Sequence, residues 1–245
     1  RFQIAYAARV MSGSMSTPLS AQPYRDRKRY AWLLSLLVPC TVAVGPALMM
    51  ATGNPLALWV PVVFFYAVAP MLDWWLGEDL SNPPESAVPA LEADRYYRWI
   101  TYLLVPVLWA AFVFSAWFVV RHDLPVHGLV AMVLITGSVG GFCINLGHEL
   151  GHKNTRLERW LAKIILAPTG YGHFFIEHNR GHHRDVATPA DPASSRMGES
   201  IYAFLLREMP GAFVRAWRLE SDRLQRDGLP RWSLRNEIVQ PALIT

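Results

Sequence analysis

Three long blocks without a charged residue constrain the fold of this 245-residue chain more than any other feature. No Asp, Glu, Lys or Arg occurs in residues 31–72, 99–120 or 124–147. The hydrocarbon core of a bilayer is about 30 Å thick, so one helical crossing needs roughly 20 apolar residues. The blocks therefore predict an all-α, polytopic membrane protein. A soluble protein with buried helices is the alternative.

The first block is too long for one crossing, and the turn-forming sequence TGNP at residues 52–55 divides it. The chain is therefore expected to cross the membrane four times. The predicted transmembrane helices are residues 32–51, 56–72, 99–120 and 125–146.

Lys and Arg cluster on one predicted side of the membrane. Four of them precede the first crossing within residues 25–29, and four follow the last crossing within residues 153–163. Basic loops stay in the cytoplasm, which also accounts for the net charge of +4. The predicted organisation is a cytoplasmic segment at 1–30, four transmembrane helices with a cytoplasmic loop at 73–98 within 31–146, and a cytoplasmic histidine-rich region at 147–237. The sequence has no basic–aromatic motif and no glycine-rich phosphate loop, so no nucleic-acid partner is predicted.

Five histidines lie in two groups after the fourth crossing, in HELGHK at residues 148–153 and in EHNRGHH at residues 177–183. Side chains four residues apart on a helix share one face. Each group can therefore aim two imidazoles at one point, and the last histidine is swung about a third of a turn away, toward a second metal or the other side of the first. The predicted metal ligands are His148, His152, His178, His182 and His183.

Two chemistries fit such ligands. The spelling H-E-x-x-H is used by zinc proteases, in which Glu149 would activate water. One zinc takes three protein ligands and a water molecule, so five histidines are too many. The alternative is an oxygen-activating site with two metal ions, which needs more imidazole ligands than one zinc does. Five histidines are too few to complete such a site.

An imidazole that binds a metal usually donates a hydrogen bond from its second ring nitrogen to a carboxylate or carbonyl oxygen. The aspartates among the candidates below have an alternative explanation. They can be charges at the membrane interface, helix caps or, in TPADP, turn-forming residues. The candidates for supporting the ligands are Asp73, Asp79, Glu149, His173, Asp185 and Asp191, with His173 also a possible ligand.

Bulky side chains on the crossings could limit the length of an apolar tunnel, although packing of helices or contact with lipid explains any single one. The main candidates are Trp59, Phe64, Phe65 and Tyr66 on the second crossing, with Trp109 and Phe112 on the third.

Residues 201–237 alternate apolar residues with seven arginines. Such a helix is typical of a membrane-surface element in contact with lipid, and it could also bind an acidic electron carrier. Residues 238–245 turn apolar again, so a further transmembrane helix is expected to begin there.

Three stretches, HELGHK, GYGHFFIEHNRGHHRDVATPADPASSRMGES and LDWWLGEDLSNPPE, resemble the integral-membrane alkane hydroxylases. These alkane 1-monooxygenases belong to the membrane desaturases and hydroxylases with histidine boxes, and the resemblance runs from about residue 24 to 245. It implies a non-haem di-iron enzyme that uses O₂ to hydroxylate the terminal methyl group of medium-chain alkanes. Electrons would come from a rubredoxin and its flavin-dependent reductase, in a bacterial inner membrane with the histidines on the cytoplasmic side.

By this resemblance the five histidines are iron ligands. The family has a third histidine region and about six crossings, so the chain is expected to be a fragment of a longer enzyme. An inactive paralogue is the alternative. A related acyl-chain desaturase or hydroxylase, the zinc protease and a metal-binding membrane scaffold also stay open as functions.

Overall fold

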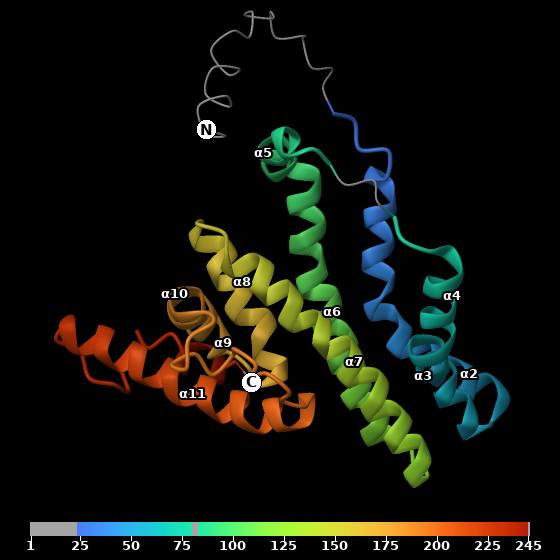
Figure 1. The fold of residues 1–245 in the computed structure, drawn as a ribbon. Helices are drawn as coiled ribbons and strands as arrows, with labels where there is room; N and C mark the ends of the chain where they lie inside the picture. Colours follow the sequence, from blue (N-terminus) through green and yellow to red (C-terminus); the bar gives the residue numbers. More distant parts are fainter. Residues whose placement is uncertain (1–23, 80–82, 245) are drawn as a thin grey trace, which may run out of the picture.

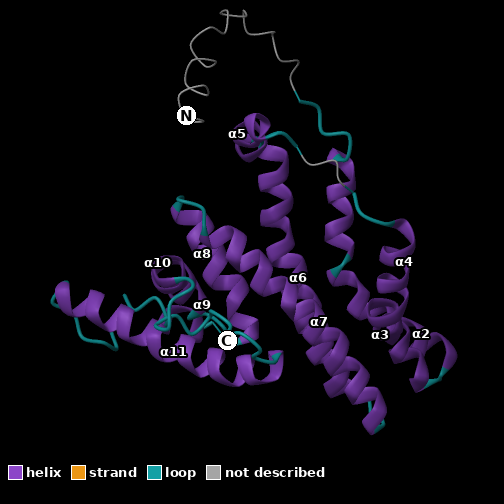
Figure 2. Cartoon of the chain, in the orientation of Figure 1, coloured by secondary structure: helices purple, strands orange, loops and turns teal. Residues whose placement is uncertain are grey.

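The structure is a computed structural model that describes residues 24–79 and 83–244. The described chain consists of helices and loops without a strand (Figure 2). Four helical segments are long and apolar enough to cross a membrane: Arg29–Thr52, Pro55–Leu76, Arg95–Arg121 and Val126–Gly151. The predicted all-α fold with four membrane-spanning helices is confirmed.

The first two spans are irregular because prolines interrupt them. Proline lacks the amide hydrogen that an α-helix needs, and the helices change type near Pro39, Pro55 and Pro61. The first span consists of the 3₁₀ helices η1 (Arg29–Leu37) and η2 (Pro39–Ala43) and of α2 (Val44–Thr52). The second consists of the 3₁₀ helix η3 (Pro55–Trp59), α3 (Val60–Val63), the π-helix η4 (Phe64–Val68) and α4 (Ala69–Leu76).

The third and fourth spans are long, regular helices, α6 (Arg95–Arg121) and α7 (Val126–Gly151). They pack against each other around a buried apolar core that includes Leu108 and Ile135. The loop before α6 holds η5 (Glu85–Ala87) and α5 (Val88–Ala93).

Asp94 joins the first span to the third at one end of the bundle. Its carboxylate caps α6 by accepting a hydrogen bond from the Tyr96 amide at 2.8 Å, and it also pairs with Arg29 at the start of η1. The chain entering the first crossing and the chain entering the third therefore lie at the same end, as the predicted orientation requires.

The remaining helices form a cap beside the C-terminal half of α7, on the side away from α2, α3 and α4 (Figure 1). They are α8 (Arg156–Leu166), η6 (Ala167–Thr169), α9 (Phe174–Ile176), the π-helix η7 (Glu177–His182), α10 (His183–Asp185), α11 (Ile201–Arg226) and α12 (Val239–Ala242).

Glu158 ties α8 to the membrane-spanning helices. The Thr155 hydroxyl caps α8 by accepting from the Glu158 amide at 3.2 Å and donates to the Glu158 carboxylate at 2.6 Å. The same buried carboxylate accepts from the Tyr102 hydroxyl of α6 at 2.8 Å. Since α8 follows the first histidine pair directly, this anchor fixes the chain where it leaves α7.

The arginines of residues 201–237 fall into two groups. Arg207, Arg215 and Arg223 make ion pairs of 2.6–2.7 Å with carboxylates of the same chain. The others are exposed and form no ion pair within the described residues: Arg218, Arg226, Arg231 and Arg235. The inward-facing group therefore stabilises the cap, and the exposed group is free to meet lipid or a partner.

We predict that Gly147→Ala destabilises the protein. A Cβ at this position would lie 2.6 Å from Cγ of Leu166, which is fully buried where α8 packs on α7. Overpacking of this kind costs about 1–3 kcal/mol. Thermal unfolding of the detergent-solubilised protein should therefore begin at a lower temperature.

The matched control is Gly141→Ala on the same helix, where an added Cβ meets nothing within 4 Å. Alanine stabilises a helix by roughly 0.5–1 kcal/mol relative to glycine. Its unfolding temperature should be unchanged or higher, and an equal loss in both variants would contradict the packing argument.

Candidate metal centre

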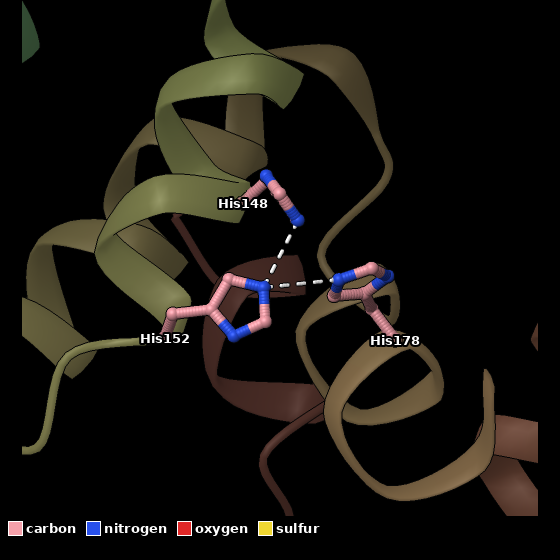
Figure 3. A group of neighbouring side chains, drawn as sticks. All are labelled: His148, His152 and His178. Atoms are coloured by element: carbon pink, nitrogen blue, oxygen red, sulfur yellow. Dashed lines mark hydrogen bonds between the residues drawn. The ribbon is translucent and has the colours of Figure 1, made fainter. Parts of the chain in front are cut away.

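Three imidazoles from two segments of the chain meet at one point (Figure 3). His148 lies in the last turn of α7, His152 caps the end of that helix, and η7 carries His178. The Nε2 atom of His152 lies 3.0 Å from that of His148 and 3.2 Å from that of His178. His183 joins them, since its Nε2 lies 3.0 Å from Nε2 of His178. Four of the five predicted ligands therefore have ring nitrogens in one cluster.

The two histidine groups reach the cluster by different helix geometries. His148 and His152 lie one α-helical turn apart, as expected. In the second group, His178 and His182 lie on the π-helix η7, whose backbone hydrogen bonds span one more residue than those of an α-helix, and His183 begins α10. The expectation of an α-helical turn is wrong for this segment, and the wider turn brings His183 beside His178.

The ring of His182 does not join the cluster of nitrogens as α-helical spacing predicts, because its Nδ1 binds a carboxylate. Its ring stacks on that of His178, with centroids 5.5 Å apart and planes at 22°. Its Nδ1 lies 2.9 Å from a carboxylate oxygen of Asp191. Because Nδ1 is engaged in this bond, Nε2 is the nitrogen of His182 that is available to a metal ion.

The cluster fits a metal ion. Metal–nitrogen bonds of about 2.0–2.1 Å place two nitrogens that share a metal roughly 3 Å apart. The three ligand nitrogens of His148, His152 and His178 lie within 4.8 Å of one another. Imidazole nitrogen suits iron, zinc, copper and nickel, so the donor set identifies a metal site without selecting the metal.

The surroundings lower the pKa of two imidazoles of the cluster, those of His178 and His152. Burial, with the neighbouring imidazoles, lowers the pKa of His178 to about 4. Burial and the proximity of His148 likewise lower the pKa of His152. Near pH 7 the rings therefore keep the lone pairs that a metal needs.

Among the predicted supporting residues, Asp191 contacts an imidazole and Asp185 does not. Asp191 is buried and contacts His182. Asp185 instead accepts hydrogen bonds from Arg184 at 2.9 Å and from Arg215 at 2.7 Å. It can act on the histidines only through these arginines.

The other acidic candidates form no bond to the cluster in the described part of the chain, although the charge of Glu149 acts on His152. Glu149 pairs with Lys153 at 2.9 Å, and Asp79 pairs with Lys28. Asp73 is exposed on α4. The structure gives these carboxylates no bond to an imidazole among the described residues.

His173 is buried between aromatic rings outside the cluster. Its ring packs edge to face against Tyr171 and Phe213, with centroids 4.5 and 5.2 Å apart. Its Nε2 has no hydrogen-bond partner within the described residues. Burial lowers its pKa to about 4, so this histidine is a neutral packing residue in the structure.

Sequence reasoning missed the buried acids of α11. Glu220 is fully buried and accepts hydrogen bonds from Arg180 at 3.0 Å and from Arg223 at 2.6 Å. The sequence holds a signal for it, because Glu220 follows Ala212 and Ala216 at four-residue intervals on one helix face. A carboxylate at such a position needs an inward-pointing partner.

An apolar cavity of about 680 Å³ lies along α6 and α7 and ends at η6. On α7 it is lined by Gly137, Gly141 and Ile144. Residues four, seven and eleven positions apart share one helix face, so His148 continues the same row toward the metal centre. The wall is almost entirely hydrocarbon, apart from small groups such as Ser115.

The proposed tunnel residues are only partly at this cavity. Phe112 lines it, whereas Trp59 and Phe65 pack against the hydrophobic core. Phe64 is exposed. Of the remaining two candidates, Tyr66 is hydrogen-bonded to Ser138 at 2.8 Å, and the indole nitrogen of Trp109 donates to the Ile164 carbonyl at 3.0 Å.

Comparisons with known proteins agree with this picture. The fatty acid desaturase family model matches residues 123–244. Alkane 1-monooxygenase 1 of Alcanivorax borkumensis is 55% identical over 91% of this chain and 55% of its own length. Alkane 1-monooxygenase of Ectopseudomonas oleovorans is 54% identical over 92% and 56%, and that of Pseudomonas putida is 52% identical over 96% and 58%. The chain spans about half the length of the curated relatives it matches.

The four candidate spans are those of a multi-pass membrane protein, and the fatty acid desaturase model matches the second half of its chain. Over most of its length, the chain is similar to proteins named alkane 1-monooxygenase.

We predict that His178→Ala removes most of the metal from the complete gene product. His178 contributes a nitrogen to contacts with both His152 and His183, so its loss opens the centre of the cluster. Metal per chain, measured by mass spectrometry on purified protein, should fall to a small fraction of the wild-type value. His127→Ala, at an exposed position near the start of α7, is the control. Equal metal content in the two variants would show that the cluster is not the binding site.

Proposed function

We propose that the complete protein is a membrane monooxygenase that uses O₂ to hydroxylate the terminal methyl group of medium-chain alkanes. One observation carries the proposal: an apolar cavity and a cluster of imidazoles lie along the same face of α7. The relatives that are named alkane 1-monooxygenase support this choice of reaction.

The metal is proposed to be a pair of iron ions. Bound iron would supply the activation of O₂. His148, His152, His178 and His183 would hold it through their clustered nitrogens, and His182 would contribute through Nε2. Five imidazoles exceed what one ion with three protein ligands uses, which favours two ions.

The cavity is suited to a substrate without a polar group. An alkane can be positioned only by shape and by burial, which contributes about 0.8 kcal/mol for each CH₂ group. The glycines Gly137, Gly140 and Gly141 leave α7 without side chains along the cavity wall. A chain lying against this wall would point one end toward His148 and stay shielded from water.

Electrons are proposed to come from a rubredoxin and its reductase. The exposed arginines of α11 and of the segment after it could attract an acidic carrier, and the encounter would then slow with added salt. The distribution of Lys and Arg favours the cytoplasmic side of a bacterial inner membrane for this region.

The alternative functions fit the geometry less well. A zinc protease needs Glu149 beside the metal, but this carboxylate pairs with Lys153 and lines a separate pocket with Lys28 and Arg98. An acyl-chain desaturase would share the metal chemistry, but its substrate carries a polar head. The wall of the apolar cavity holds no charged side chain to receive one.

A product assay tests the proposal directly. The complete gene product would be supplied with octane, O₂ and a rubredoxin system, and the expected product is 1-octanol. His178→Ala serves as the inactive control. An iron-loaded, folded preparation that forms no alcohol from any alkane of medium length would overturn the proposed function.

We predict that Gly140→Leu shortens the range of alkanes accepted. An added Cβ meets only Thr169, at 3.9 Å, so the larger side chain can enter the cavity without disturbing the helices. The ratio of product from decane to product from hexane should therefore fall. Phe65→Ala removes a ring that packs against the core and does not line the cavity, so the ratio should stay unchanged.

Val126→Leu, at an exposed position on α7 outside the cavity, is the control for this series. An unchanged ratio in Gly140→Leu would remove the cavity from the substrate path. A raised ratio in Phe65→Ala would show that this position limits chain length.

A further inference from the structure

Arg215 lies where α11 crosses the second histidine segment. Its guanidinium donates to a carboxylate oxygen of Asp185 at 2.7 Å, to one of Asp191 at 3.1 Å and to the Ala190 carbonyl at 3.2 Å. The Arg215 side chain is only 13% exposed. This single residue therefore connects α11 to the end of α10 and to the middle of the loop that follows it.

Asp191 carries the effect of Arg215 to an imidazole. The Asp191 side chain is completely buried. One carboxylate oxygen accepts from Arg215, while the other lies 2.9 Å from Nδ1 of His182 and accepts from the Ser194 hydroxyl at 2.5 Å. A carboxylate bound on both sides has little freedom to rotate, so the Arg215 contact helps to set the orientation of the His182 ring.

The guanidinium also lies against the backbone of the π turn. A Cβ added to Gly181 would be 2.9 Å from Nε and 3.1 Å from Cζ of Arg215. Gly181 stands directly before His182, inside η7. Close contact with a rigid, planar group thus supports the unusual turn on which three of the five histidines depend.

We propose that Arg215 is a positioning residue of the metal centre. It orients His182 through Asp191 and supports the π turn through Gly181. A lysine cannot replace it, because one ammonium group cannot bind both aspartates in the forked geometry of a guanidinium. The inference rests on the proposed metal-dependent function and names a residue that acts on the site without touching metal or substrate.

The test compares Arg215→Met and Arg215→Lys with Arg218→Met in the complete gene product. Arg218 is an exposed arginine three residues along the same helix, without an ion pair in the described structure. Ferrous ion is titrated into metal-free protein by anaerobic equilibrium dialysis, and the Mössbauer spectrum of the iron-57 form is recorded. Changes of partners behind a ligand typically cost about 10–100-fold in metal affinity.

We expect a loss of ferrous affinity in that range for Arg215→Met, a smaller loss for Arg215→Lys and none for Arg218→Met. The quadrupole splitting should change in the two Arg215 variants, because the ring of His182 is reoriented. A purely structural role would lower thermal stability while leaving the affinity and the spectrum of the folded protein unchanged. That result would overturn the proposal.

If Arg215→Met does not fold, Gly181→Ala is the second test of the proposal. The added methyl group displaces the Arg215 guanidinium but leaves its charge in the protein. Wild-type ferrous affinity in a folded Gly181→Ala variant would overturn the proposal. Different results would overturn the proposed function and the proposed role of Arg215. Wild-type protein that binds no iron overturns the proposed function, whereas iron-binding wild type with unaffected Arg215 variants overturns only the role of Arg215.

Discussion

Ion pairs of buried carboxylates behind the second histidine segment hold the candidate metal centre together. Imidazoles with ring nitrogens about 3 Å apart gain little from one another, so the surrounding chain must fix them. Glu220 does so by binding Arg180, which lies between the histidines of η7, and Asp191 does so by binding Arg215. Both carboxylates are fully buried, so each depends on its arginine partners to offset the loss of water around its charge.

The helix α7 joins the two halves of the proposed chemistry. It borders the apolar cavity along most of its length and ends in the first histidine pair. A rigid helix therefore fixes the distance between the place where a hydrocarbon can lie and the place where a metal can bind. The capped start of α8, with Thr155 bound to Glu158, keeps the chain beyond His152 from moving this end.

The sequence predicts the elements that one physical rule controls. Long charge-free blocks can be solvated only by lipid or by protein, so the four spans follow from composition. The pair His148 and His152 follows from helical periodicity alone. The conformation of η7 does not, because an α-helix and a π-helix differ by one residue per turn, and packing against Arg215 and Glu220 selects between them.

The tunnel residues were harder to predict for a related reason. An apolar span offers no polar face to mark its orientation, so the sequence does not say which aromatic ring faces a cavity and which faces lipid. Phe112 lines the cavity whereas Phe64 is exposed. The more informative signal was the absence of side chains, since Gly137, Gly140 and Gly141 recur on the cavity face of α7.

The π turn makes the second histidine segment sensitive to the number of its residues. An α-helix becomes a π turn when one residue is inserted, and it returns to the α form when one is deleted. The adjacent pair His182 and His183 occupies both the fourth and the fifth position after His178. A one-residue deletion between His178 and His182 would move these two rings to the third and fourth positions after His178. The number of residues in the motif, as well as their identity, therefore determines the arrangement of the ligands.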